Sequence, residues 1–154
     1  MKNILLLVFV LISATTTAQR NKLKNITEKD GKIGIGTKAP DELLTVKGKI
    51  HTQEVLVDLN GAVAPDYVFE GYYEGTSKLN TTYNFPSLSE IELYVKEHHH
   101  LPGVPSAEEM NENGLSLKKM NLVLLEKLEE LTLYTIQQQK EIDLLKESLK
   151  EMDR

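Results

Sequence analysis

The chain has 154 residues, with 18 basic and 23 acidic side chains, a formal net charge of −5 at pH 7 and no cysteine. The acidic balance argues against binding to nucleic acid or to anionic membranes, because both need a basic patch on the protein. Without cysteine the chain has no disulfides, so we expect it to gain stability by oligomerisation instead.

The first eighteen residues have the pattern of a secretory signal peptide. Lys2 precedes an apolar run at residues 4–12, and Thr16 and Ala18 fit the −3 and −1 positions of a signal-peptidase site. The apolar run is too short for a permanent membrane span. We therefore expect cleavage after Ala18 and an exported protein, secreted or at the cell surface, with no membrane span. Residues 19–30 are polar and predict a flexible leader.

Residues 31–63 predict a β-rich segment. Glycine and isoleucine alternate over residues 31–37, which favours either an ordinary edge strand or a strand packed closely at a symmetry axis, where larger side chains would not fit. Two or three further short strands are expected within residues 43–57, and Asn60-Gly61 predicts a turn.

Residues 64–115 predict a small module of helices and loops. Residues 64–69 are expected to be extended with aromatic anchors, and residues 71–84 to form a polar loop. Two Ser-x-x-Glu capping boxes then predict the starts of two helices, and Asn113-Gly114 predicts the end of the second. The boxes are Ser87 with Glu90 and Ser106 with Glu109.

Residues 116–154 predict one long coiled-coil helix, capped by Ser116. Apolar residues recur with a 3.5-residue period, which keeps one stripe turned toward a partner helix. Polar residues inside this stripe can fix register and strand number, but the heptads alone leave dimer and trimer open. With Leu117 at position d, the expected oligomer seam is Leu117, Asn121, Leu124, Leu128, Leu131, Thr135, Gln138, Ile142, Leu145, Leu149 and Met152.

The first half of this helix carries additional apolar residues beyond the seam. Val123, Leu125 and Tyr134 widen the stripe between residues 120 and 136. A wide stripe predicts that this half also packs against the small module.

Few residues could support catalysis or metal binding, and we expect no catalytic, cofactor-binding or metal site. The run 98–100 consists of three histidines at a predicted helix end, where imidazolium suits the helix dipole better than three adjacent side chains suit one tetrahedral ion. The acid pairs Glu108-Glu109 and Glu129-Glu130 are expected to be solvated. Four aromatic residues favour core or oligomer contacts, with a glycan-binding surface as the alternative. They are Tyr67, Phe69, Tyr72 and Tyr73.

Several segments together resemble a known family. The segment 34–48 is similar to the "GIGTxxPxxxLxVxG" stretch of secreted phage-tail-fibre-like proteins of Bacteroidetes, and residues 65–69, 100–107 and 120–134 resemble later parts of the same proteins. This family is related to the intramolecular chaperone domain of tail spikes and endosialidases (peptidase S74). The resemblance covers roughly residues 31–150.

The resemblance implies a homotrimer whose C-terminal module templates a fibre. Active S74 members release that module with a Ser-Lys dyad, whereas residues 63–68 of this chain contain neither serine nor lysine. We therefore expect an α+β, non-catalytic structural protein that acts in trimerisation and chaperone-like registration of an exported fibre or surface protein. A trimeric adhesin or carbohydrate-binding module is the main alternative, and a self-cleaving peptidase is a further one.

Overall fold

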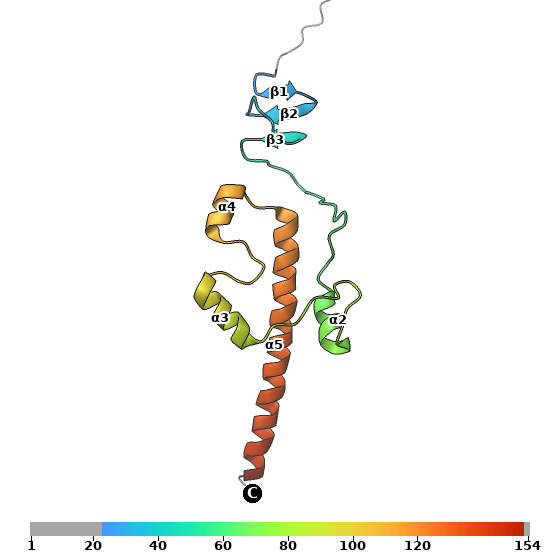
Figure 1. Cartoon of the computed structure of the whole chain (residues 1–154), viewed down its shortest axis with the longest axis vertical. Helices are drawn as coiled ribbons and strands as arrows, with labels where there is room; N and C mark the ends of the chain where they lie inside the picture. The colour runs from blue at the N-terminus through green and yellow to red at the C-terminus, as the bar shows by residue number, and fades with distance from the viewer. Residues whose placement is uncertain (1–22, 153–154) are drawn as a thin grey trace, which may run out of the picture. The chain divides into compact units, whose positions relative to one another are not determined.

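A computed structural model describes residues 23–152 (Figure 1). Within these residues the protein is α+β, with a three-stranded sheet followed by four helices, of which the last is long. The described residues divide into two compact units, with the boundary between Val55 and Leu56. The expected signal peptide at residues 1–18, its cleavage site and the start of the leader lie outside the described residues.

The sheet of the first unit contains β1 (Ile26–Lys29), β2 (Lys32–Ile35) and β3 (Leu44–Val46). Strands β1 and β2 are antiparallel, and β3 is parallel to β2. Asp30 and Gly31 join β1 to β2 with φ values of 52° and 77°. Two consecutive residues with positive φ form the kind of tight turn that matches the twist of a hairpin.

Two expectations for this unit need correction. Residues 26–29 lie within the leader expected to be flexible, yet they form β1, because β2 offers them a complete antiparallel partner. Residues 50–57 were expected to contribute strands, yet they have no regular structure. Val55 and Val57 are 57% and 44% exposed, so the alternating pattern of this segment buries no apolar face, and the segment does not extend the described sheet of β1, β2 and β3.

Gly34 in β2 and Gly36 directly after it allow a close approach within the chain itself. A Cβ atom at Gly34 would lie 2.6 Å from the Thr37 carbonyl oxygen, and one at Gly36 would lie 2.9 Å from that of Lys47. Gly36 also has a φ of +72°, which residues with a side chain rarely adopt. These glycines are therefore required by the tight packing of the chain's own turn and of the segment that follows β3.

The second unit contains α2 (Tyr67–Glu74), α3 (Leu88–His98), α4 (Ala107–Asn113) and α5 (Leu117–Met152). Both capping boxes are confirmed, because each serine hydroxyl accepts from the N3 amide and each glutamate accepts from the N-cap amide. Gly114 ends α4 as expected. The Ser116 hydroxyl accepts from the Lys119 amide at 3.4 Å, so Ser116 also lies at the start of α5 as expected.

Helix α2 replaces the extended segment and part of the loop that the sequence predicted. Its residues Tyr-Val-Phe-Glu-Gly-Tyr-Tyr-Glu have strand-like propensity, but the helix turns Tyr67 and Val68 together onto Leu133 of α5. Tertiary packing thus overrides local preference. Partly buried aromatic and apolar residues complete this core: Phe69, Tyr72, Tyr83 and Phe85.

Candidate functional site: the exposed seam of helix α5

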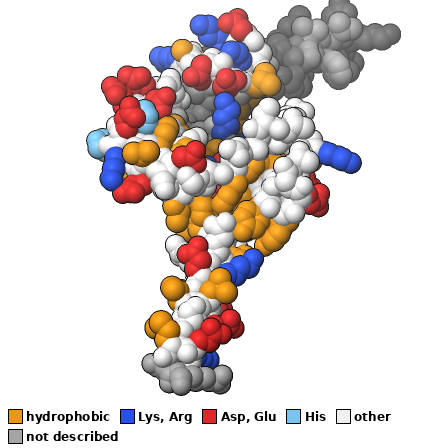
Figure 2. Space-filling view, turned by 60° about the horizontal axis from the view of Figure 1, so that its bottom comes forward, with side chains coloured by type: hydrophobic (Ala, Val, Ile, Leu, Met, Phe, Trp, Pro, Cys, Tyr) orange, Lys and Arg blue, Asp and Glu red, His pale blue; other side chains and the backbone are white. Residues whose placement is uncertain are grey.

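All eleven seam residues lie on the surface of the chain. Leu124 is 50% exposed, Leu131 is 59% exposed and Leu145 is 64% exposed, and the polar members of the seam are exposed as well. Hydrophobic side chains remain visible along the protruding length of α5 (Figure 2). The structure therefore leaves the whole predicted seam accessible to a partner.

The opposite face of α5 packs against the rest of the second unit. The buried residues of this helix are Glu129, Glu130, Leu133 and Tyr134, which occupy heptad positions b, c, f and g. The expectation that the first half of α5 packs on the small module is confirmed. In its first half, α5 thus packs one face against its own chain and leaves the seam exposed, whereas residues 138–152 are exposed on all sides.

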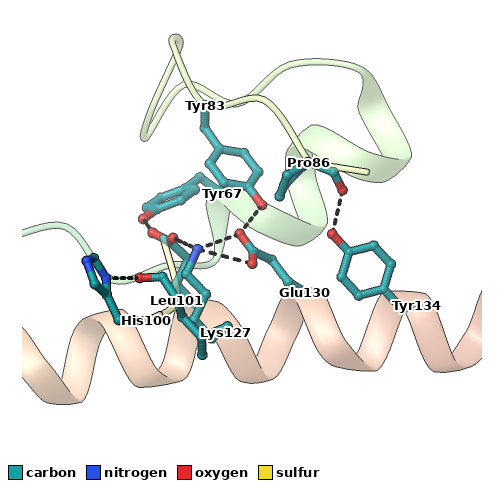
Figure 3. Close-up of polar contacts among 9 residues, drawn as sticks. Tyr67, Tyr83, Pro86, His100, Leu101, Lys127, Glu130 and Tyr134 are labelled. Carbon is teal, nitrogen blue, oxygen red and sulfur yellow. Dashed lines mark hydrogen bonds and ion pairs between the residues drawn. The ribbon is translucent and has the colours of Figure 1, made fainter. Parts of the chain in front are cut away.

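An ion-pair cluster holds the module against this buried face (Figure 3). The Lys127 ammonium lies 2.7 Å from a Glu126 carboxylate oxygen and 3.0 Å from a Glu130 carboxylate oxygen. The Tyr67 hydroxyl donates to Glu126, and the Tyr83 hydroxyl donates to Glu130 at 3.0 Å. The cluster therefore ties α2 and the segment after it to α5.

Tyr134 makes a further link between α5 and the segment that precedes α3. Its hydroxyl donates to the Pro86 carbonyl oxygen (Figure 3). Its ring packs against Phe85 with ring centroids 4.7 Å apart. Burial and the nearby Glu130 and Glu90 raise the pKa of Tyr134 to about 12. The phenol therefore remains a hydrogen-bond donor at neutral pH.

The environment of the cluster shifts the pKa values of its members. Burial and the neighbouring Glu126 raise the pKa of Tyr67, and burial and Glu130 raise that of Tyr83. Burial disfavours the charged form of Lys127, but its hydrogen bonds to the two glutamates outweigh this effect and raise its pKa. Both tyrosines stay neutral donors and Lys127 stays charged, so the contacts persist across the neutral pH range.

Glu129 and Glu130 were expected to be solvated, and that expectation is wrong. Glu129 is 8% exposed and Glu130 is 2% exposed, because α2 and the following segment cover this part of α5. Glu130 is paired with Lys127, whereas one oxygen of Glu129, Oε2, is buried without a hydrogen-bond partner. Burial, with Asp66 and Glu126 nearby, raises the pKa of Glu129. The position of a glutamate along a helix does not by itself show whether the side chain is buried or solvated.

The three histidines lie at the end of α3 as expected. His98 is its last residue and His99 is the C-cap, with a φ of 61° and its amide bonded to the Val95 carbonyl. The rings of His98 and His100 pack around Tyr94, with centroids 4.2 Å and 5.6 Å from its ring. Among residues 23–152 there is no cluster of three or more potential metal-binding side chains with suitable placement.

The four aromatic residues named from the sequence do not form a single surface. Tyr67 is buried in the core, and Phe69 and Tyr72 pack around it. Tyr72 also contacts Phe85, with ring centroids 5.4 Å apart. Tyr73 alone among the four is largely exposed, at 63%.

A pocket of about 860 Å³ lies between the loops around α3 and α4 and the first turns of α5. Its walls include Tyr94, Pro105 and Met120, with His100, Glu109 and Lys119 as polar members. This pocket was not predicted from the sequence, because it depends on how residues 94–123 fold back on one another and on Ala62 and Val63.

No helix of the described residues is long and apolar enough to cross a membrane. Comparison with protein-family models, with curated proteins and with solved structures finds no significant match to this chain.

Proposed function

We propose that the chain is a structural trimerisation module of an exported fibre or surface protein, without catalytic activity. Helix α5 assembles three copies, and the assembled helices hold the N-terminal segments in register, as an intramolecular chaperone does. The observation that carries this proposal is that every seam residue of α5 is exposed, while the residues that the helix buries against its own chain, all within 129–134, lie outside the seam.

The energetics of α5 support association. Helix α5 has 36 residues and an exposed aliphatic stripe. Burying this stripe between helices would stabilise an assembly strongly, because each buried leucine contributes about 1.5–3 kcal/mol. Seven members of the seam are leucine or isoleucine. The heptad period is the geometry that brings such a stripe onto a partner helix, so the seam fits a second copy of itself.

The choice of three strands rests on the resemblance to tail-fibre proteins. Thr135 and Gln138 lie one after the other in the seam, and polar residues at such positions restrict the number and register of helices. Once the helices associate, the three N-terminal segments are tethered together and their pairing becomes intramolecular. This raises their effective concentration and favours slow strand association.

The test is the mass in solution of residues 19–154, measured by light scattering on a sizing column. Three times the chain mass supports the proposal. A single-chain mass over the micromolar range would overturn it, and a mass of two chains would retain the coiled coil but reject the trimer. The intact mass of the chain after prolonged incubation tests for self-cleavage. A chain that cuts itself would contradict a non-catalytic role.

A further inference from the structure

The sheet of the first unit has one polar face and one aliphatic face. In the β1–β2 pairing Ile26 lies opposite Ile35, and in the β2–β3 pairing Ile35 lies opposite Val46. The next row of the same face contains Glu28, Ile33 and Leu44. Because side chains alternate along a strand, five of these six residues form a continuous aliphatic face.

The aliphatic face is open. Ile26, Ile33 and Leu44 are 45%, 44% and 59% exposed, and Ile35 is 37% exposed. Its one charged residue, Glu28, lies at the hairpin end and accepts a hydrogen bond from the Gly31 amide at 3.4 Å. The centre of the face is therefore neutral and apolar, so two such faces can meet without repulsion between like charges.

The other face is closed by the chain's own turn. Gly34 and Thr45 are buried on that side, and the Thr45 hydroxyl donates to Asp41 at 2.6 Å. The Lys32 ammonium on the same face donates to the Asp41 carbonyl oxygen at 2.6 Å. The turn around Asp41 therefore covers part of the polar face, whereas nothing among the described residues covers the aliphatic face.

We infer that the aliphatic face of the sheet packs against the same face of two further copies of this chain around a common axis. This inference rests on the proposed function, because the face is too small to hold copies together unaided. Five aliphatic side chains bury less than the roughly 1,200 Å² that a free-standing specific interface needs. Association of α5 supplies the missing free energy by tethering identical sheets at high effective concentration.

Tethering through α5 also determines which partner packs on the aliphatic face of the sheet. Among possible partners, the sheets of the copies joined through α5 are present at the highest local concentration. A three-stranded sheet of this size has no hydrophobic core of its own, since only Gly34 and Thr45 are buried in it, so packing of three aliphatic faces would supply one.

The natural chain lacks cysteine, so one introduced thiol reports on one position. We would prepare residues 19–154 with Ile35→Cys on the aliphatic face and, as a matched control, Lys29→Cys on the polar face of the same sheet. Mild oxidation followed by non-reducing electrophoresis measures covalent dimers. Because a disulfide joins only two of three cysteines around an axis, at most about two-thirds of the chains can be linked.

Cross-linking of Ile35→Cys well above that of Lys29→Cys, in samples with the mass of three chains, supports the inference. Ile33→Cys lies on the same face and provides a second variant if Ile35→Cys lowers the yield of folded protein. Equal or absent cross-linking at both faces, with the trimer mass retained, would overturn the inference and leave the proposed function standing. A single-chain mass would instead overturn the proposed function, and this inference with it.

Discussion

Leu131 and Leu133 lie two residues apart on α5 and face opposite sides of the helix, with Leu131 59% exposed and Leu133 fully buried. Residues two positions apart are separated by about 200° around the helix axis, so these two leucines lie on different surfaces of α5. Leu133 belongs to the core beneath α2, and Leu131 belongs to the free seam. This separation allows the fold and the assembly to be tested independently.

The leucine pair Leu144 and Leu145 gives a matched test of the seam. The two residues are 63% and 64% exposed in the single chain, but Leu145 is in the seam at position d and Leu144 lies outside it at position c. Leu145→Ala is expected to weaken the assembly by about 2–4 kcal/mol, because the leucine is buried between helices, whereas Leu144→Ala changes it little. Sedimentation equilibrium across a dilution series measures both. Equal effects of the two substitutions would show that the seam is misassigned.

A double substitution tests the half of the seam nearest the module. Leu128→Ala with Leu131→Ala is expected to dissociate the assembly, since each buried leucine contributes roughly 2–5 kcal/mol. Both residues are exposed in the single chain, so its helical content and its core should be retained. Light scattering with circular dichroism checks both statements. A variant that keeps the mass of the unmodified assembly would contradict the seam.

Gln138 places a polar side chain at a d position of the seam. Gln138→Leu is expected to raise the thermal unfolding temperature of the assembly, because an aliphatic residue replaces a buried amide, and to relax the control of register. Lys140→Leu is the control, because it adds the same side chain to the outward face at position f. Thermal unfolding at matched concentration is the measurement. A marked loss of stability for Gln138→Leu would mean that the amides form satisfied hydrogen bonds between chains.

Lys127 is the only cation of the cluster beneath α2, and its side chain is 15% exposed. Lys127→Met is expected to destabilise the second unit by about 3 kcal/mol, because Glu126 and the almost fully buried Glu130 lose their counterion. Urea unfolding at fixed protein concentration measures the change, with the exposed Lys140→Met as control. An unchanged unfolding midpoint would show that the two carboxylates are solvated in solution.

Glu129 predicts a specific pH dependence. Burial and the nearby Asp66 and Glu126 raise its pKa in the folded chain, so the protonated form is favoured there. Its contribution to stability is therefore present in acid and lost as the pH rises through the raised pKa. Glu129→Gln removes the charge and is expected to stabilise the unit at pH 7 by about 1 kcal/mol, with a difference that shrinks toward pH 4.

Urea unfolding from pH 4 to pH 8 measures this dependence. Glu147→Gln, at an exposed position of α5, is the control for the general effect of removing one acid. A Glu129→Gln variant that is less stable than the unmodified chain at pH 7 would contradict the prediction. It would indicate that the Glu129 carboxylate has a hydrogen-bond or charge partner that the amide of glutamine cannot bind.

Local signals predicted α3, α4 and α5 well. Each helix start depends on a serine and on side chains within four residues of it, and Gly114 supplies the backbone conformation that ends α4. Such signals need no knowledge of distant contacts. The boundaries of these helices could therefore be predicted from the sequence alone.

Features that depend on distant contacts could not be predicted. Helix α2 forms from residues with strand-like propensity because Leu133, more than sixty positions later, supplies the surface on which Tyr67 and Val68 pack. The burial of Glu129 and Glu130 depends on the same contact. Residues 50–57 show the converse, because they match a strand pattern in the sequence and yet add no strand to the described sheet.

The link from Tyr67 to Glu126, 59 positions apart, has a consequence for the order in which the chain is made. A ribosome releases the aromatic residues of α2 long before it reaches Leu133 and Tyr134, so the core of the second unit cannot close until the first half of α5 has been synthesised. A chain that stops before residue 126 would leave those aromatic residues uncovered and open to degradation. Synthesis of the first half of α5 thus acts as a checkpoint, because only chains that extend past Leu133 contain all the residues of this core.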